Sequence, residues 1–410
     1  MPRMLYADKT GHETVYPLDK KIGLICTKDV RMRYTQRFSD LFARLVVEMP
    51  ERRANEILEM LIGYKVGLAS TPVIMSAIGE IYNAETDTGE NVTAGDRDGH
   101  PGGGIGFLAE TMAQINGHKD KDKIIPAAVM KADNPVESAK NNNKASLTAH
   151  YICCDGTGVP GIKKELEGVK GRQCDGSAKT FEAKLGVSFK QDFDRNGKPL
   201  LKNGEIFRRE GDTKYIGTVE KVEEFGSMLN HFAKSNGIER SDQAVFIGDG
   251  ATWIWNLQKK YFPDAIAIVD KYHAIENLNK IIDLLRFNKK HIREAFRGTC
   301  QGLLSLGKIE ELDACVMGKA INANREKVSK KLEYFRKNKE RMRYGLFTAA
   351  GLFVGSGVVE AACKTIVCSR LKRAGSHWSK KGAAAVIAIR CAIQSNEFNK
   401  HLPQDCSRTA

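Results

Sequence analysis

Two short apolar runs, each ending in Asp-Gly, constrain the fold of this chain more than any other feature. The first run, residues 151–154, leads into Asp155-Gly156, and the second, residues 244–248, leads into Asp249-Gly250. Runs of this length and composition are typical of buried strands. Asp-Gly at the exit of a strand is ordinary turn chemistry, and it also places a carboxylate at the edge of a sheet. We therefore expect a buried sheet with two carboxylates at the ends of its strands.

The elements around these runs alternate in a defined order. Alternating or continuous apolar residues predict strands over residues 149–154, 184–191, 214–219, 244–247 and 265–269, with helices over 222–236 and 253–261. Three strands, a helix, a strand, a helix and a strand is the order of ribonuclease H-like proteins. The expected fold class is therefore α/β, with a ribonuclease H-like catalytic domain whose core spans residues 148–276.

The first 82 residues predict an all-helical N-terminal domain. Apolar residues at steps of three and four predict helices over 34–49 and 51–62, and Ser70-Thr71-Pro72 is typical of the start of a third helix that runs to about residue 82. This arrangement favours a helix-turn-helix-like unit whose second helix enters a DNA major groove. A helix pair that only packs is the alternative. Residues 83–147 are polar and glycine-rich, and we expect a partly disordered linker there.

A helical insertion is expected over residues 277–350, where no strand pattern occurs. Helices that complete the core follow over 351–397, and then a tail over 398–410. The end of the insertion is strongly basic and includes Lys330, Lys331, Arg336 and Lys337. These cations exceed what pairing along a helix requires, which favours contact with DNA phosphates over a merely solvated face.

Bulk composition agrees with a nucleic-acid enzyme. The formal net charge of +14 favours a polyanionic partner. Ten cysteines without a Cys-x-x-Cys pair indicate reduced thiols. The sequence has neither a signal peptide nor a membrane-spanning stretch. We therefore expect a cytoplasmic, nucleoid-associated bacterial protein with no membrane partner.

Six blocks of the sequence together resemble the bacterial insertion-sequence transposases of the DDE class, in their Kra-type branch, and more distantly the Mutator-like elements. The blocks are residues 155–157, 181–186, 247–256, 268–274 and 355–360, and Arg370-Leu371-Lys372 with Trp378-Ser379. The resemblance covers about residues 17–397. It implies Mg²⁺-dependent (or Mn²⁺-dependent) cutting and joining of double-stranded DNA at the ends of the element, by a homodimer or a higher homo-oligomer.

The same resemblance implies Asp155, Asp249 and Glu360 as the catalytic residues and metal ligands. Three carboxylates can hold two divalent cations about 4 Å apart for phosphoryl transfer, and magnesium suits such oxygen ligands. Asp270 and His273 fill an accessory Asp-x-x-His position, where Asp270 is also a rival for the second ligand and a structural role is the alternative for His273. For Glu360, the alternative is an exposed helical glutamate that pairs with Lys364.

Positive charge continues along the chain beyond Glu360. The residues expected to contact DNA there are Lys364, Arg370, Lys372, Arg373 and Trp378. Relatives of this kind usually begin with a cysteine-rich zinc ribbon, whereas only Cys26 stands near the start here, so the chain looks shortened at its N-terminus. Two rival functions follow: a decayed or domesticated copy that binds DNA without cutting it, and a nuclease of the same fold without strand transfer.

Overall fold

The computed structural model describes residues 30–62, 70–87, 147–166 and 180–398, together with Val66 and three short strands before residue 28. Most of the expected linker, residues 88–146, and the last twelve residues of the expected tail lie outside the described residues.

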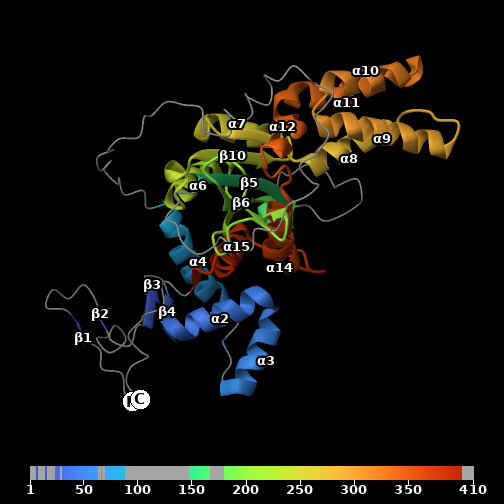
Figure 1. Ribbon diagram of the computed structural model, residues 1–410. Helices are drawn as coiled ribbons and strands as arrows, with labels where there is room; N and C mark the ends of the chain where they lie inside the picture. The colour runs from blue at the N-terminus through green and yellow to red at the C-terminus, as the bar shows by residue number, and fades with distance from the viewer. Residues whose placement is uncertain are drawn as a thin grey trace.

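A five-stranded mixed sheet forms the centre of the molecule (Figure 1). Its strands, in spatial order, are β11 (Ile266–Val269), β10 (Gln243–Gly248), β5 (Leu147–Pro160), β6 (Thr180–Phe193) and β9 (Lys214–Thr218). β10 runs parallel to both β11 and β5, whereas β6 is antiparallel to both of its neighbours. The mixed sheet and its helices confirm the α/β class, and every strand predicted from residue 148 onward is present.

The core of the sheet is apolar on both faces. Residues 151–154 of β5 are all buried, which explains why this run is continuously apolar rather than alternating. On one face, α6 (Val222–Ser235) packs so closely that a Cβ on Gly186 would lie 2.5 Å from Leu229. On the other face, α15 (Lys380–Gln394) packs so closely that a Cβ on Gly217 would lie 2.7 Å from Ile387. The sheet is therefore sandwiched between helices.

The remaining short elements border this sheet. They are α7 (Thr252–Tyr261), which packs on α6, the 3-10 turns η2 (Lys163–Leu166) and η3 (Ile238–Arg240), and the hairpin of β7 (Leu201–Lys202) and β8 (Glu205–Ile206). The hairpin was not predicted. Its turn contains Asn203 and Gly204, both at positive φ, and Asn-Gly is the local signal that identifies such a turn.

The N-terminal part is not all-helical, contrary to the prediction. Helices α2 (Gln36–Glu48), α3 (Glu51–Ile62) and α4 (Thr71–Asp87) form where expected. Two antiparallel strand pairs precede them: β1 (Tyr6–Ala7) with β2 (Thr14–Val15), and β3 (Leu24–Thr27) with β4 (Val30–Thr35). The β-branched residues of β3 and β4 favour extended chain, and the antiparallel ladder satisfies their backbone groups.

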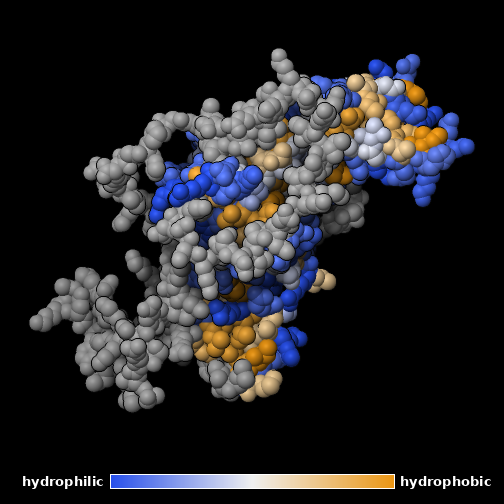
Figure 2. Space-filling model, viewed as in Figure 1, coloured by the Kyte–Doolittle hydropathy of each residue, from blue (hydrophilic) through white to orange (hydrophobic). Residues whose placement is uncertain are grey.

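Helix α4 is a core helix rather than a free recognition helix. Over residues 71–82 only Pro72 and Glu80 are exposed. Gly79 lies so close to α15 that a Cβ there would be 2.7 Å from the Cα of Ala385. This packing contradicts the helix-turn-helix interpretation and supports the alternative of a packed helix pair. Figure 2 shows apolar surface over α2 and α3, and Leu41 and Met60 are exposed on these helices.

The insertion is helical, as predicted, and projects from the sheet as an arm (Figure 1). It consists of α8 (Lys271–Ile282), α9 (Lys290–Leu306), α10 (Ile309–Lys319), α11 (Asn322–Asn338), the 3-10 turn η4 (Lys339–Met342) and α12 (Tyr344–Ala349). The chain then returns to the sheet through α13 (Gly357–Ala362), the π-helix η5 (Cys363–Cys368) and α14 (Ser369–Leu371), and ends its described part with α15. None of the described helices is both long and apolar enough to cross a membrane.

Candidate active site

Three aspartates lie at the same level of the sheet, on three neighbouring parallel strands. In the ladder, Ile247 lies opposite Cys153 and Gly248 lies opposite Val269. Continuing this register places Asp155 level with Asp249 and Asp270. Asp249 and Asp270 follow the last residues of β10 and β11, whereas β5 continues past Asp155 to Pro160, so the expectation that Asp155 ends its strand is wrong. Adjacent strands are about 4.8 Å apart. The chain thus brings three carboxylates of distant sequence to one level of the sheet, although their hydrogen bonds give them different roles.

Asp155 is half-buried, and its hydrogen bonds only partly offset the cost of burying its charge. One of its oxygens, Oδ1, accepts a hydrogen bond from the Gly156 amide at 2.7 Å, and Oδ2 accepts a weak one from the Cys363 thiol at 3.5 Å. Burial raises the pKa of Asp155 above its ordinary value, the Gly156 amide opposes the shift, and the charge of Asp249 adds to it. A carboxylate in this position is stabilised by a bound cation.

Asp249 is held by the turn that it begins. Its Oδ1 accepts a hydrogen bond from the Ala251 amide at 2.8 Å. The intervening Gly250 has φ of +101°, a conformation that favours glycine. Within the described part of the chain, neither Asp155 nor Asp249 forms an ion pair with a lysine, arginine or histidine. Their oxygens are the type of ligand that Mg²⁺ and Mn²⁺ prefer, so the donor set fits these cations.

Glu360 adopts the arrangement that the alternative interpretation predicts. It is the fourth residue of α13, its side chain is 53% exposed, and its Oε1 lies 2.7 Å from the Lys364 ammonium. The helix itself lies beside Asp155, because Cys363, one turn further on, contacts that carboxylate. Among the described residues, no group of three or more His, Cys, Asp or Glu side chains is arranged to hold a metal ion. The three-carboxylate site therefore stays a prediction.

Asp270 is a structural clamp rather than a free ligand. It is almost fully buried, and its Oδ1 caps α8 by accepting from the His273 amide at 2.8 Å. Its Oδ2 accepts from both the amide and the hydroxyl of Ser356, the residue before α13. Asp270 therefore fastens the start of the helix that carries Glu360. Because both oxygens are engaged, Asp270 is disfavoured as the second metal ligand.

The His273 side chain is not buried in the core. It is partly exposed, and its charge weakly opposes the burial that raises the pKa of Asp155. His273 therefore lies close enough to Asp155 to influence it electrostatically. This position agrees better with an accessory residue than with a buried structural histidine.

The lysines expected to contact DNA are exposed. Lys330, Lys331 and Lys337 are exposed on α11, and no ion pair involves them in the described part of the chain. Lys372 donates to the Thr157 hydroxyl at 2.6 Å and so lies two residues from Asp155 along β5. Lys364 instead pairs with Glu360.

Arg370 is disfavoured as a DNA contact because it is buried and packs on Trp378, whereas Trp378 is partly exposed and its contact with DNA stays a prediction. Arg370 is 7% exposed, its guanidinium lies 4.7 Å from the centre of the Trp378 ring, and its Nε donates to the Val46 carbonyl. The Trp378 indole in turn donates to the Leu371 carbonyl.

Two further arginines expected to contact DNA instead contact other groups of the protein. Arg336 forms ion pairs with Asp313 at 2.9 Å and with Glu333 at 2.7 Å. Arg373 donates to the Glu48 carbonyl at 2.8 Å. Arg336 is therefore engaged with two carboxylates, whereas Arg373 is exposed and contacts only carbonyl oxygens among the described residues. DNA contact by either residue stays a prediction.

Two residues near the carboxylates were missed by the sequence interpretation. Cys363 stands three residues after Glu360, and this helical spacing is the signal that could have identified it. Tyr334 of α11 donates its hydroxyl to the Asp249 backbone carbonyl at 2.9 Å. It is 85 residues away from Asp249 and carries no local signal.

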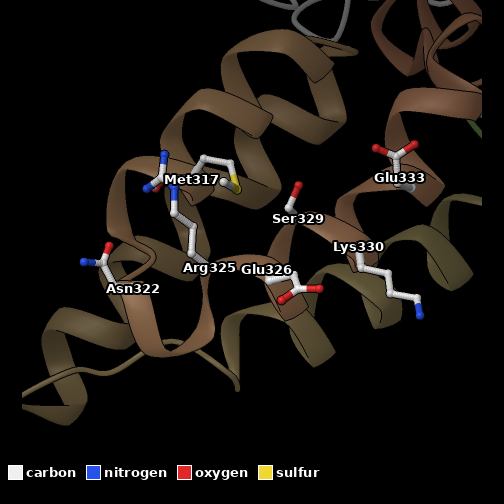
Figure 3. A pocket seen from close by; sticks show the side chains of 7 residues that line it. All are labelled: Met317, Asn322, Arg325, Glu326, Ser329, Lys330 and Glu333. Carbon is white, nitrogen blue, oxygen red and sulfur yellow. The ribbon is translucent and has the colours of Figure 1, made fainter.

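An open hollow of about 670 Å³ lies on the insertion rather than at the strand ends (Figure 3). Its lining mixes cations and anions, with Arg325 and Lys330 beside Glu326 and Glu333. None of the three expected catalytic carboxylates lines it. The mixed charge does not identify a ligand.

A family model described as an uncharacterised protein family, UPF0236, matches residues 170–400. The matched range contains Asp249, Asp270, the insertion and Glu360, and it begins after Asp155. No curated protein matches the chain.

Proposed function

The chain belongs to the uncharacterised protein family UPF0236, and we propose that it is a DNA transposase that cuts and joins DNA at the ends of an insertion sequence. Its catalytic residues are Asp155, Asp249 and Glu360, with Mg²⁺ or Mn²⁺ as the cofactor. The observation that carries the proposal is the carboxylate pair of Asp155 and Asp249 at the same level of adjacent parallel strands. The six sequence blocks that resemble DDE transposases support it.

The electrostatics of the pair favour a catalytic role over turn chemistry. An aspartate that only closes a turn does not need a second carboxylate nearby. Asp155 has one: it is partly buried, and the charge of Asp249 raises its pKa further. Like charges held together in a protein are typical of sites that bind cations or transfer protons. The absence of a cationic side chain paired with either residue, within the described part of the chain, agrees with a metal-binding role.

The residues of this chain have separable roles in the proposed reaction. When bound, the metal ions polarise the scissile phosphodiester and the attacking oxygen. Asp155 and Asp249 would hold them, and Glu360 would complete the ligand set. The exposed ion pair of Glu360 with Lys364 would have to break for this, at a cost of about 0.3–0.5 kcal/mol. Lys364 is then free to pair with a phosphate, as are Lys372 and the exposed lysines of α11.

The chemistry consists of two in-line displacements. Water attacks the phosphorus, the bond to the 3′ oxygen breaks, and the 3′-hydroxyl leaves. That hydroxyl then attacks a phosphodiester of the target DNA and displaces its 3′ oxygen in the same way. Because two element ends take part, we propose that a homodimer or a higher homo-oligomer carries out the reaction on double-stranded DNA.

Replacing either carboxylate by its amide tests the proposal. Asp155→Asn and Asp249→Asn should each reduce Mg²⁺-dependent cleavage of DNA by at least about 100-fold, because the amide does not hold the cation, while DNA affinity stays within about twofold. Asp194→Asn is the matched control, because Asp194 closes a turn by accepting from the amides of Asn196 and Lys198. Cleavage at the wild-type rate by either active-site variant would show that its aspartate is a turn residue.

A second function, binding DNA without cutting it, is favoured by a specific observation. Glu360 is paired with Lys364, and no three-ligand metal cluster is formed among the residues that the structure describes. A wild-type protein that binds DNA but does not cut it with either Mg²⁺ or Mn²⁺ would support this second function. Cleavage without any joining of ends would instead support a nuclease.

A further inference from the structure

The insertion reaches back to the sheet through the side chain of Tyr334. The Tyr334 hydroxyl donates to the backbone carbonyl of Asp249 at 2.9 Å. The ring lies against Gly250, where an added Cβ would be 2.4 Å from the Tyr334 Cε2. Helix α11 is therefore in direct contact with the turn that begins at Asp249.

The contacted turn determines where the Asp249 carboxylate points. Its Oδ1 is held by the Ala251 amide, two residues further along the same turn. Gly250 between them adopts the left-handed conformation, which is strained for any other residue. A shift of the Asp249 carbonyl therefore moves the carboxylate as well, because backbone and side chain are joined in one hydrogen-bonded ring.

Tyr334 is itself held firmly within α11. Its backbone carbonyl accepts from the Asn338 side chain at 2.8 Å, and its ring packs edge-on against Phe335 with centroids 5.2 Å apart. A movement of α11 is therefore transmitted to the tyrosine hydroxyl.

The same side of α11 carries exposed cations. Lys330 precedes Tyr334 by four residues and Lys337 follows it by three, so the three side chains form one stripe along the helix. Neither lysine forms an ion pair in the described part of the chain. DNA phosphates bound to these lysines would lie along the stripe that contains Tyr334.

We propose that Tyr334 is a positioning residue that couples DNA held on α11 to the orientation of the Asp249 carboxylate. This inference rests on the proposed function for the role of Asp249. It assigns to the insertion a second task besides DNA binding: the insertion keeps the Asp249 turn in the arrangement that binds a cation while DNA is present.

Tyr334→Phe tests the coupling, because it removes only the hydroxyl that contacts Asp249. Tyr82→Phe is the matched control, since the Tyr82 hydroxyl also donates to a backbone carbonyl, that of Phe398, far from the strand ends in sequence and on another helix. Two measurements are made on the full chain: amide hydrogen exchange of residues 249–252 with and without double-stranded DNA, and the Mn²⁺ concentration that gives half-maximal cleavage.

In the wild type and in Tyr82→Phe, DNA should slow amide exchange in residues 249–252. In Tyr334→Phe this protection should fall by about fivefold, the factor given by about 1 kcal/mol for one hydrogen bond. The Mn²⁺ requirement should rise by a similar factor, whereas the DNA dissociation constant should stay within about twofold. A merely structural tyrosine would lower thermal stability without changing either measurement.

The inference would be overturned if DNA slowed amide exchange of residues 249–252 equally in Tyr334→Phe and Tyr82→Phe. It would also be overturned if DNA did not slow exchange of these residues in the wild type. Failure of the proposed function gives a different result. A wild-type protein that binds DNA and does not cleave it would refute the transposase activity, and the exchange measurement would still decide whether Tyr334 couples DNA to the Asp249 turn.

Discussion

The Asp155 carboxylate stands where its own charge is unfavourable, between partial burial and the neighbouring charge of Asp249. Asp270 lies at the same level of the sheet as Asp155 and is almost fully buried, yet its carboxylate accepts three hydrogen bonds. The difference between these residues lies in their partners rather than in their place on the sheet. A buried carboxylate whose oxygens all accept hydrogen bonds stabilises the fold. A buried carboxylate with too few hydrogen bonds to offset its lost hydration is available to a ligand.

The raised pKa of Asp155 predicts how stability changes with pH. The pKa of Asp155 in the folded protein lies above the ordinary value of 3.8. Its contribution to the free energy of unfolding is therefore fully present below pH 3.8 and is lost as pH rises through the folded pKa. At pH 7 without metal, Asp155→Asn should therefore be more stable than the wild type. The advantage should shrink as pH falls toward 4. Urea unfolding in EDTA at both pH values measures it, and a less stable Asp155→Asn at pH 7 would contradict it.

The exposed pair of Glu360 and Lys364 predicts that Glu360 matters for chemistry and not for stability. Glu360→Gln should change the free energy of unfolding by no more than about 0.5 kcal/mol, because exposed pairs at this spacing contribute that little. DNA cleavage should nevertheless be abolished. Glu80→Gln, which breaks the exposed pair with Lys381, is the control for stability. Continued cleavage by Glu360→Gln would remove this residue from the active site.

At the level of elements, α11 separates two kinds of cation. Arg336 is directed to Asp313 of α10 and ties the two helices together, whereas Lys330, Lys331 and Lys337 remain exposed. A count of basic residues does not distinguish these roles, because the partner of Arg336 is 23 residues away. The structure therefore assigns packing to the arginine, and we propose the exposed lysines for DNA binding.

Replacing the three lysines by alanine should weaken DNA binding in a salt-dependent way. Each lysine that neutralises a phosphate contributes about one unit to the slope of log affinity against log salt, so the slope should become shallower by up to about three. Alanine at Lys198, Lys221 and Lys259, which are exposed outside the insertion, is the control. Binding titrations at several salt concentrations compare the two triple variants, and equal slopes would exclude α11 as the DNA-binding element.

Local sequence patterns predicted most elements of the sheet and the insertion to within a few residues, because apolar periodicity reflects burial directly. The β7 and β8 hairpin was missed although Asn203-Gly204 signals it. The neighbouring positions of Asp155 and Asp249 were also predictable, since both aspartates follow apolar runs. The continuation of β5 beyond Asp155 was not, because Gly156 and Gly158 are typical of a turn. The contacts of Arg370 and Tyr334 were not, because their partners lie 324 and 85 residues away. Only the tertiary fold determines such pairs.

At the scale of the whole molecule, the N-terminal helices pack against the last described helix. Helix α4 lies against α15, and Gly79 makes the closest approach, with Ala385. The Tyr82 hydroxyl adds a contact to the Phe398 carbonyl. The N-terminal helices are therefore joined to the sheet through the last helix.

This packing predicts opposite effects for two helical glycines. In Gly79→Ala the added methyl would lie 2.7 Å from the Ala385 Cα, and forcing the helices apart should cost about 1–3 kcal/mol of unfolding free energy. In Gly318→Ala, within α10, no atom lies within 4 Å, so the variant should be as stable as the wild type or up to about 1 kcal/mol more stable. Urea denaturation measures both, and an unchanged Gly79→Ala would contradict the close packing.

The late position of α15 has a consequence for synthesis on the ribosome. Nearly the whole chain must emerge before this helix can cover its face of the sheet, so the exposed lysines of α11 are translated well before the fold is closed. We expect an interrupted polypeptide ending at residue 379 to leave that apolar face bare and to be digested rapidly by proteases. Resistance of this truncated chain to limited proteolysis would refute the idea. Incomplete translation then yields a substrate for degradation, and not a stable competitor that occupies DNA without cutting it.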